Sequence, residues 1–223
     1  MSGDPSPSNH EWNVVESGRW IALDSHAGAI ERGRDRLRSR PNAVETDDGV
    51  RLGSLTVDLV VADAFEFATE CGEEFDAIVG NAFFDIVDAD RAVSAIRRAT
   101  DLVYAPITYD GRTAFEPSDP DDEVVLRRYE SHMREHRPGS PDGANALYAE
   151  LSDVIADRPS PWLIEPPYAD GERTVLEHLL ETIEGAVAET GGDAGEWVDR
   201  RREQVATERL RYEAANRDLL GRP

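Results

Sequence analysis

The chain has 223 residues, 39% of them hydrophobic, and this length and composition predict one globular domain with a real core. No apolar run approaches the roughly 18 residues that cross a bilayer, so we expect no membrane span. The first ten residues lack the apolar stretch of a secretory signal, and a cytoplasmic protein is the expectation. A single cysteine, Cys71, excludes an intramolecular disulfide and a cysteine-clustered zinc site.

The charge is strongly acidic. Aspartate and glutamate total 46 against 24 basic residues, all of them arginine, and the formal net charge is -22. Such a charge repels itself at low salt, whereas at about 1 M salt the screening length falls to about 3 Å. We infer a cytoplasm of very high ionic strength, as in extreme halophiles; an acidic surface that mimics nucleic acid or binds a basic partner is the alternative. Without a basic stripe, no direct binding to a nucleic-acid backbone is expected.

The predicted elements alternate between strands and helices. After an irregular segment, 1–18, a strand at 19–24 leads into a helix that begins at Ser25, its expected N-cap, and ends before Pro41. A polar stretch with a turn at 47–49 precedes the next strand. Further apolar runs are predicted to form strands, and most of the remaining predicted helices lie in the second half of the chain. The expected strands lie at 57–63, 75–81 and 102–108, with others at 160–165 and 209–215, and the expected helices at 89–99, 121–136, 142–157, 172–189 and 194–207.

Continuous apolar runs of four to six residues are typical of parallel strands that helices cover on both faces. The pattern therefore predicts an α/β, doubly wound, Rossmann-like and mostly parallel sheet with a more helical C-terminal half. In such a sheet, ligands bind at the carboxyl ends of the strands. Three runs end there in Asp24, Asp63 and Asn81. An Asp at this edge can accept hydrogen bonds from both hydroxyls of a ribose, and a second can accept from an adenine amino group. The alternative is that these acids cap the following helices.

The same runs carry a family resemblance. Trp20-Ile21-Ala22-Leu23-Asp24-Ser25 resembles the second strand of class I S-adenosylmethionine-dependent methyltransferases, and Val60-Val61-Ala62-Asp63-Ala64-Phe65 resembles their third. The segment from Phe75 to Phe84 resembles the fourth strand and the loop beside the transferred methyl group. The resemblance covers most of 19–223.

The resemblance implies a cofactor, S-adenosylmethionine, and a methyl acceptor that is a small molecule or another unknown group. It implies that the cofactor contacts Asp24, Ser25, Asp63, Ala64, Asn81 and Ala82. It implies that the acceptor lies near Phe83, Phe84 and Asp85, with the helical part, about 117–207, as an elaboration on the acceptor side. Methyl transfer would be an in-line displacement that depends on proximity and orientation, and no general base can be named.

One part of the family pattern is missing. Class I methyltransferases open with a strand and a Gly-rich E/D-x-G-x-G-x-G turn, and this sequence contains no G-x-G. A short strand over 12–15 leaves no room for a crossover helix before Trp20. Three explanations stay open: a truncated reading frame, a degenerate non-catalytic relative, or a start supplied by another chain. A dehydrogenase-type nucleotide binder would need a similar glycine turn, and a non-catalytic interaction scaffold is the other rival.

Four smaller patterns have an ordinary structural explanation available. His132 and His136 have metal-ligand spacing on a helix, but Met133 stands where the metalloprotease motif requires glutamate, so no metal site is expected. The acidic run at 119–123 lacks the spacing of a calcium-binding EF-hand and is typical of a solvated turn. His26 is either a helix cap or a cofactor contact. Asn81-Ala82-Phe83-Phe84 lacks both prolines of the loop that positions a nucleophilic nitrogen in amino-group methyltransferases, and its two phenylalanines suit core packing.

Overall fold

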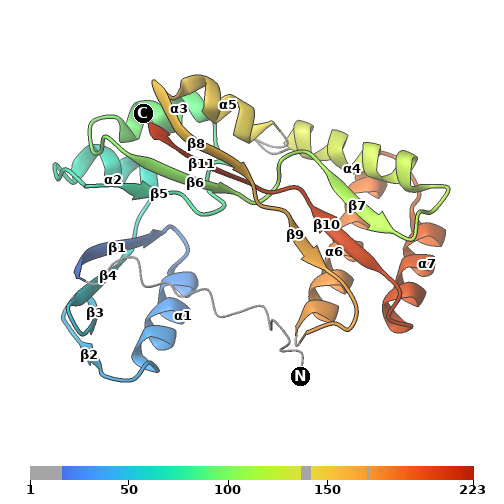
Figure 1. The fold of residues 1–223 in the computed structure, drawn as a ribbon, viewed down its shortest axis with the longest axis horizontal. Coiled ribbons are helices and arrows are strands. Elements are labelled where there is room, and N and C mark those ends of the chain that lie inside the picture. Colours follow the sequence, from blue (N-terminus) through green and yellow to red (C-terminus); the bar gives the residue numbers. More distant parts are fainter. Residues whose placement is uncertain (1–16, 137–141, 170) are drawn as a thin grey trace, which may run out of the picture. The chain divides into compact units, whose positions relative to one another are not determined.

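A computed structural model describes residues 17–136, 142–169 and 171–223 (Figure 1). The chain divides into two compact units, Met1–Cys71 and Gly72–Pro223. The sequence predicts a single domain over 19–223. That the two units together form this one domain stays a prediction. The expected strand over 12–15 lies outside the described residues.

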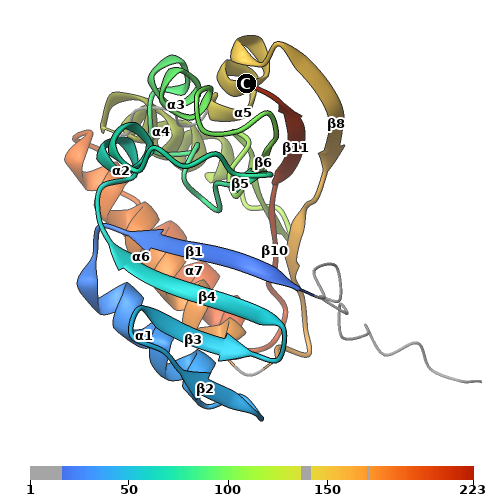
Figure 2. The ribbon, with the colours of Figure 1, turned by 90° about the vertical axis from the view of Figure 1, so that its left-hand side faces the viewer.

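Unit 1 is a four-stranded sheet packed on one long helix. Its strand order is β1-β4-β3-β2, with β1 parallel to β4 and the other two pairs antiparallel (Figure 2). The helix α1 connects β1 to the β2–β3 hairpin, whose second strand returns into β4. The elements are β1 (Gly18–Asp24), α1 (Ala27–Arg38), β2 (Ala43–Glu45), β3 (Gly49–Leu52), β4 (Leu55–Val61) and α2 (Ala64–Glu70).

The core of unit 1 is small. Ile30 of α1, Val50 of β3 and Leu59 of β4 form a buried cluster. Gly49 is needed where β3 passes β4, because a Cβ there would lie 1.9 Å from the Val57 carbonyl oxygen. The predicted turn at 47–49 is confirmed, but the strands on either side of it were not predicted. No residue of β1 is fully buried.

The described residues of unit 2 form two sheets and five helices. The sheets have the orders β5-β6-β11-β8 and β7-β10-β9. Only β5 and β6 pair in parallel, and the other strand pairs of these two sheets are antiparallel. The strands are β5 (Ile78–Val79), β6 (Val103–Ile107), β7 (Thr113–Glu116), β8 (Asp153–Pro159), β9 (Trp162–Ile164), β10 (Arg211–Ala214) and β11 (Arg217–Arg222), and the helices are α3 (Ala89–Ile96), α4 (Asp122–His136), α5 (Gly143–Glu150), α6 (Glu172–Glu189) and α7 (Gly195–Ala206).

The two sheets of unit 2 share three stretches of chain. Each of these stretches contributes one strand to each of the two sheets (Figure 1). The stretches run from β6 to β7, from β8 to β9 and from β10 to β11. Backbone hydrogen bonds continue across the junction, where Ala215 donates to Arg112 and accepts from Asp110. The helices α4, α6 and α7 pack on the β7-β10-β9 sheet around Phe115, Trp197 and Tyr212.

The α/β class is confirmed, but its details differ from the prediction. Antiparallel pairing exceeds parallel pairing because hairpins and the returning C-terminal strands add neighbours to the two parallel pairs. In the β5-β6-β11-β8 sheet, Ala105 and its strand partner Leu219 are buried, whereas the neighbouring residue, Tyr104, is 36% exposed. The helices α3 and α5 lie on one side of this sheet (Figure 2). Helices of unit 2 therefore cover one face of this sheet, although the apolar runs predicted cover on both.

Most predicted elements of unit 2 are present with shifted ends. The predicted helix over 142–157 is wrong in its second half: α5 ends at Glu150, and 153–159 form β8. The run at 75–81 gives only a two-residue strand, although backbone hydrogen bonds to the β6 chain begin at Phe75 and continue to Ala82. The weakly predicted strands at 160–165 and 209–215 are confirmed as β9 and β10, and β7 and β11 were not predicted. No helix of the described ranges is long and apolar enough to cross a membrane.

Candidate functional site

Asp24 and Asp63 lie at one edge of the unit 1 sheet. Parallel pairing aligns Asp24, the last residue of β1, with Val61, the last residue of β4. The amide of Ala62 donates to the carbonyl oxygen of Asp24 at 3.2 Å, so the two chains stay paired beyond the strands. Asp63 follows directly, and both aspartates are exposed. The sequence prediction that these two carboxylates share the carboxyl edge of a parallel pair is confirmed.

Asp24 shapes the start of α1. Its Oδ1 accepts a 2.7 Å hydrogen bond from the amide of His26. His26, rather than the predicted Ser25, is the N-cap of α1, and its Nδ1 accepts from the amide of Ala29 at 3.2 Å. The extended backbone of His26 and the reach of its imidazole give it this role, one of the two that the sequence left open. Ser25 itself is exposed beside Asp24.

Asp63 is the N-cap of α2. Its Oδ1 accepts from the amides of Phe65 at 2.8 Å and Glu66 at 3.1 Å. The capping alternative therefore holds for this residue. Both bonds use Oδ1, which leaves the lone pairs of Oδ2 for other donors at the exposed edge. Ala64, the first residue of α2, is half-buried.

The segment after β5 lies in unit 2 and forms a tight turn. Asn81 and Ala82 are exposed, and Ala82 has a φ of 48°. Gly80 permits this turn because a Cβ would lie 2.3 Å from Cε2 of Phe84. The Phe84 ring is 1% exposed and meets the Phe83 ring edge-on with centroids 5.4 Å apart, so the core-packing interpretation holds for Phe84. Because Asn81 belongs to the other unit, its closeness to Asp24 and Asp63 stays a prediction.

Asp85, the acid of the predicted acceptor segment from Phe83 to Asp85, is buried, with 6% of its surface exposed. Its Oδ2 accepts from the amide of Thr108 at 2.9 Å and also binds the Thr108 hydroxyl. These bonds join the segment after β5 to the end of β6, where parallel strands present ligands. The second oxygen, Oδ1, is buried with no hydrogen-bond partner among the described residues. Such an unsatisfied buried acceptor is unusual and marks a position where a donor from a ligand or a water would be stabilised.

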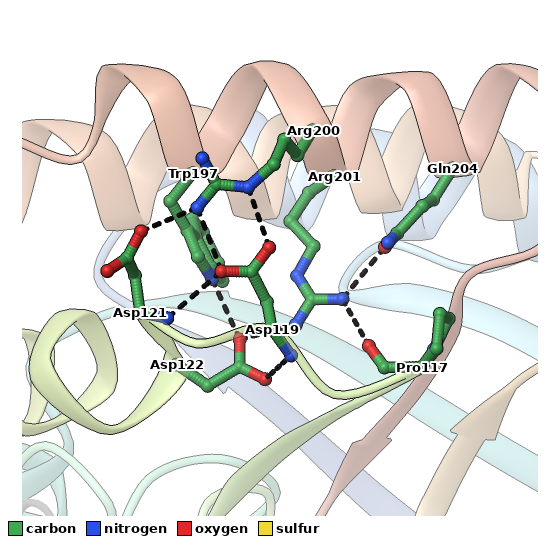
Figure 3. Close-up of polar contacts among 8 residues, drawn as sticks. All are labelled: Pro117, Asp119, Asp121, Asp122, Trp197, Arg200, Arg201 and Gln204. Atoms are coloured by element: carbon green, nitrogen blue, oxygen red, sulfur yellow. Dashed lines mark hydrogen bonds and ion pairs between the residues drawn. The ribbon is translucent and has the colours of Figure 1, made fainter.

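The acidic run before α4 binds arginines of α7 (Figure 3). Arg200 binds both oxygens of Asp119, with Nε 2.7 Å from Oδ2 and Nη2 2.8 Å from Oδ1, and Nη2 also lies 2.6 Å from Oδ2 of Asp121. The hydrogen bond from Arg200 is the main reason that the pKa of Asp119 falls to about 2. Arg200, for its part, has a raised pKa because of the same hydrogen bonds. The prediction of a merely solvated acidic turn is therefore wrong, because these carboxylates are bound to guanidinium groups.

A fully buried arginine completes this contact. Arg201 donates from Nη1 to the Pro117 carbonyl at 2.7 Å and to Gln204 Oε1 at 2.8 Å, and its Nη2 binds Asp122. Its guanidinium also lies 5.3 Å from the centroid of the Phe115 ring. The sequence analysis missed this role of Arg201. The available signal was its position on the apolar stripe of α7, where a buried charge requires a partner.

Comparisons with known proteins give structural likenesses only. No known family model and no curated protein matches the chain. One similar solved structure is a candidate type II methyltransferase from Anaeromyxobacter dehalogenans, at 16% identity and a TM-score of 0.48, covering 92% of this chain and 80% of that one. Another is a candidate sarcosine dimethylglycine methyltransferase from Galdieria sulphuraria, at 10% identity and a TM-score of 0.41, covering 91% and 68%. A third is a mycolic acid cyclopropane synthase in complex with SAH and CTAB, at 12% identity and a TM-score of 0.36, covering 89% and 69%. The α/β assignment therefore rests on the chain's own strand pairing.

Proposed function

We propose that the chain belongs to the class I methyltransferases and that the edge formed by Asp24 and Asp63 binds the adenosine part of S-adenosylmethionine. The observation that carries the proposal is the pairing of β1 with β4, which places two exposed carboxylates at neighbouring carboxyl ends. A carboxylate at the end of β1 suits the two hydroxyls of a ribose. Oδ1 of Asp24 keeps one lone pair beside its bond from the His26 amide, so each oxygen can still accept a charge-assisted hydrogen bond. Oδ2 of Asp63 suits the adenine amino group, because helix capping uses only Oδ1.

The residues of unit 1 suit the adenosine part of the cofactor. This sequence contains no Gly-rich turn that would bind the rest of the cofactor. S-adenosylmethionine supplies a methyl group on a sulfonium, which is already a good leaving group. The protein's contribution would be to hold the acceptor in line with the methyl group, and this requires proximity rather than strong acid–base chemistry. In this proposal Ser25 and Ala64, which directly follow Asp24 and Asp63, add further cofactor contacts.

The acceptor side is proposed to include the segment from Phe83 to Asp85 and the helical part, about 117–207. Phe84 would act by packing on Gly80, and Asp85 would offer its unsatisfied Oδ1 as an acceptor for a polar group. The acceptor in this proposal is a small molecule or another unknown group, and the net charge of -22 suits a cytoplasm of high ionic strength.

Binding of the cofactor product tests the proposal. S-adenosylhomocysteine is titrated into the protein by calorimetry in molar potassium chloride, with NAD as a competitor for the dehydrogenase alternative. Asp24→Asn and Asp63→Asn are the test variants, because asparagine keeps the cap and the turn while it removes the charge. We expect each to weaken binding about 10- to 100-fold, as for the loss of a charge-assisted hydrogen bond.

Asp35→Asn is the matched control, since Asp35 is exposed in the last turn of α1 in the same unit, at the opposite edge of the sheet. The chain after α1 enters β2 at Ala43, which pairs with Leu52 beside the start of β4. The control variant should bind like the wild type. Saturable binding that both test variants leave unchanged would contradict the assigned edge. No binding of S-adenosylhomocysteine at millimolar concentration would contradict the proposal and favour a non-catalytic scaffold, an alternative that the missing Gly-rich turn supports.

A further inference from the structure

Two histidines and a glutamate gather where two helices of unit 2 end. His132 and His136 lie one turn apart at the end of α4, and Glu189 is the last residue of α6. The two helices pack together through the core that contains Met133 and Val187. One ligand atom from each of the three side chains lies within 4.8 Å of the other two. Glu189 could not be expected here from the sequence, because it is 57 residues from His132.

The hydrogen bonds orient both imidazoles. Nδ1 of His136 lies 2.9 Å from the carbonyl oxygen of His132. A carbonyl oxygen only accepts, so Nδ1 of His136 donates to it, and in the neutral imidazole Nε2 then keeps its lone pair. This arrangement, with one ring nitrogen donating to the backbone, is the one that fixes metal-binding histidines in their ligating form. Nε2 of His132 lies 2.6 Å from Oε2 of Glu189, and the two rings stack with centroids 4.4 Å apart.

The surroundings favour a cation. α4 ends at His136 and α6 at Glu189, so the partial negative charges of two helix ends point to the same place. The Glu189 carboxylate adds a full negative charge. Arg128 lies one turn earlier on α4 and donates to the Thr190 carbonyl at 3.4 Å, so its charge is engaged with the backbone beside the cluster. The His132 side chain is 16% exposed and that of Glu189 is 67% exposed, which leaves an open approach from solvent.

We propose that His132, His136 and Glu189 bind a divalent transition metal, with Zn²⁺ as the best match, and thereby join the ends of α4 and α6. Two imidazole nitrogens and one carboxylate suit Zn²⁺, Co²⁺ or Ni²⁺ rather than Mg²⁺ or Ca²⁺, which prefer oxygen. In a tetrahedral zinc site with bonds of about 2 Å the ligand atoms stand about 3.3 Å apart. The ligand atoms here lie between 2.6 Å and 4.8 Å apart, a range that includes this value. Small side-chain rotations would therefore bring the three atoms into zinc geometry, and water would complete the coordination. The inference is independent of the methyltransferase proposal.

The alternative is an ordinary hydrogen bond between His132 and Glu189 without a metal. The two differ in metal stoichiometry. Co²⁺ is titrated into the intact protein in high salt, followed by its visible absorption, and Zn²⁺ binding is measured by competition and by the melting temperature. We expect one equivalent to bind with micromolar or tighter affinity and to raise the melting temperature, because a ligand that binds only the folded state stabilises it.

His132→Gln, His136→Gln and Glu189→Gln each remove one ligand, and each should weaken binding by at least about tenfold. His136 and Glu189 are exposed, so their variants test the site without disturbing the core. His178→Gln is the control, since His178 on α6 has a side chain that is 81% exposed and also neighbours a glutamate, Glu181. Absence of saturable binding, or equal weakening by His178→Gln, would overturn the proposal.

Discussion

The guanidinium of Arg200 binds the carboxylate of Asp119 through two parallel hydrogen bonds, from Nε to Oδ2 and from Nη2 to Oδ1. This bidentate pair links α7 to the turn that precedes α4 (Figure 3). The Asp119 side chain is 6% exposed and that of Arg200 is 40% exposed. The pair is therefore half in solvent, and its contribution lies between those of surface and buried ion pairs.

Acid should weaken this link. The pKa of Asp119 is about 2 in the folded protein and 3.8 ordinarily, so the folded state holds the carboxylate more strongly than the unfolded chain does. The stability it contributes is fully present above about pH 4 and is lost as the pH falls toward 2. Asp119→Asn should lower the free energy of unfolding at pH 7 by about 1–2 kcal/mol.

Chemical denaturation from pH 7 to pH 2 in high salt measures this effect. The difference between Asp119→Asn and the wild type should shrink as the pH falls below 4. Asp101→Asn is the control, because Asp101 is exposed and lies outside this network. A difference that stays constant over the whole range would contradict the assigned role of the Asp119 charge.

Removal of Arg201 should cost more. This side chain is 0% exposed, and its loss leaves the Pro117 carbonyl oxygen without this donor and removes one of the donors that bind the Asp122 carboxylate. Breaking a buried charged contact from one side costs several kcal/mol, and since Asp122 keeps a 2.8 Å bond from Trp197 we expect about 2–4 kcal/mol for Arg201→Met.

Arg202→Met provides the comparison. Arg202 follows Arg201 in the chain, its side chain is 36% exposed, and it lies 3.5 Å from Glu177 and 3.7 Å from Glu184. Surface pairs of this kind contribute about 0–1 kcal/mol. Equal losses of unfolding free energy for the two variants in urea would show that burial of Arg201 has no special weight.

The sequence predicted the edge with Asp24 and Asp63 because the evidence for it is local. Each aspartate follows an apolar run, and parallel pairing alone brings the two strand ends together. The role of Arg201 and the meeting of His132 with Glu189 depend on helix packing across 79 and 57 residues, and no local pattern reports such contacts. The one local signal is a charged residue on the apolar stripe of a helix, which indicates a buried ion pair, and Arg201 on α7 is such a residue.

Strand β8 shows the limit of periodicity. Its residues alternate between exposed and half-buried from Asp153 to Asp157, which fits a strand, but the helical pattern of α5 runs into it with no glycine or proline between. The pairing of β8 with β11, whose partner residues lie 58 to 69 positions later in the chain, decides its conformation. β11 itself was not predicted, because its short apolar core of Leu219 and Leu220 becomes a strand only between β6 and β8.

Gly80 should not tolerate a side chain. An added Cβ would lie 2.3 Å from Cε2 of Phe84, and that ring is 1% exposed, so it has little room to move. We expect Gly80→Ala to lower the free energy of unfolding by about 1–3 kcal/mol, as for an overpacked core. The strain falls on the segment that carries Asn81 and Asp85.

Gly185→Ala is the matched control, because no atom lies within 4 Å of a Cβ placed there in α6. Alanine favours a helix interior over glycine by about 0.8–1 kcal/mol, so this variant should be more stable than the wild type. Opposite signs of the two changes in thermal or urea unfolding are the expected result. A neutral Gly80→Ala would mean that the Phe84 ring is not held in the position described.

Low salt should unfold the protein. With a net charge of -22, the compact state repels itself, and arginine pairs such as Arg200 with Asp119 offset only part of that repulsion. Raising potassium chloride from about 0.1 M to about 1 M shortens the screening length from about 10 Å to about 3 Å, so the melting temperature should rise steeply over this range. Sucrose at matched osmolality is the control, since it stabilises by exclusion from the surface and not by screening. A melting temperature that responds equally to sucrose and to salt would contradict the electrostatic explanation, because only ions shorten the range of the repulsion.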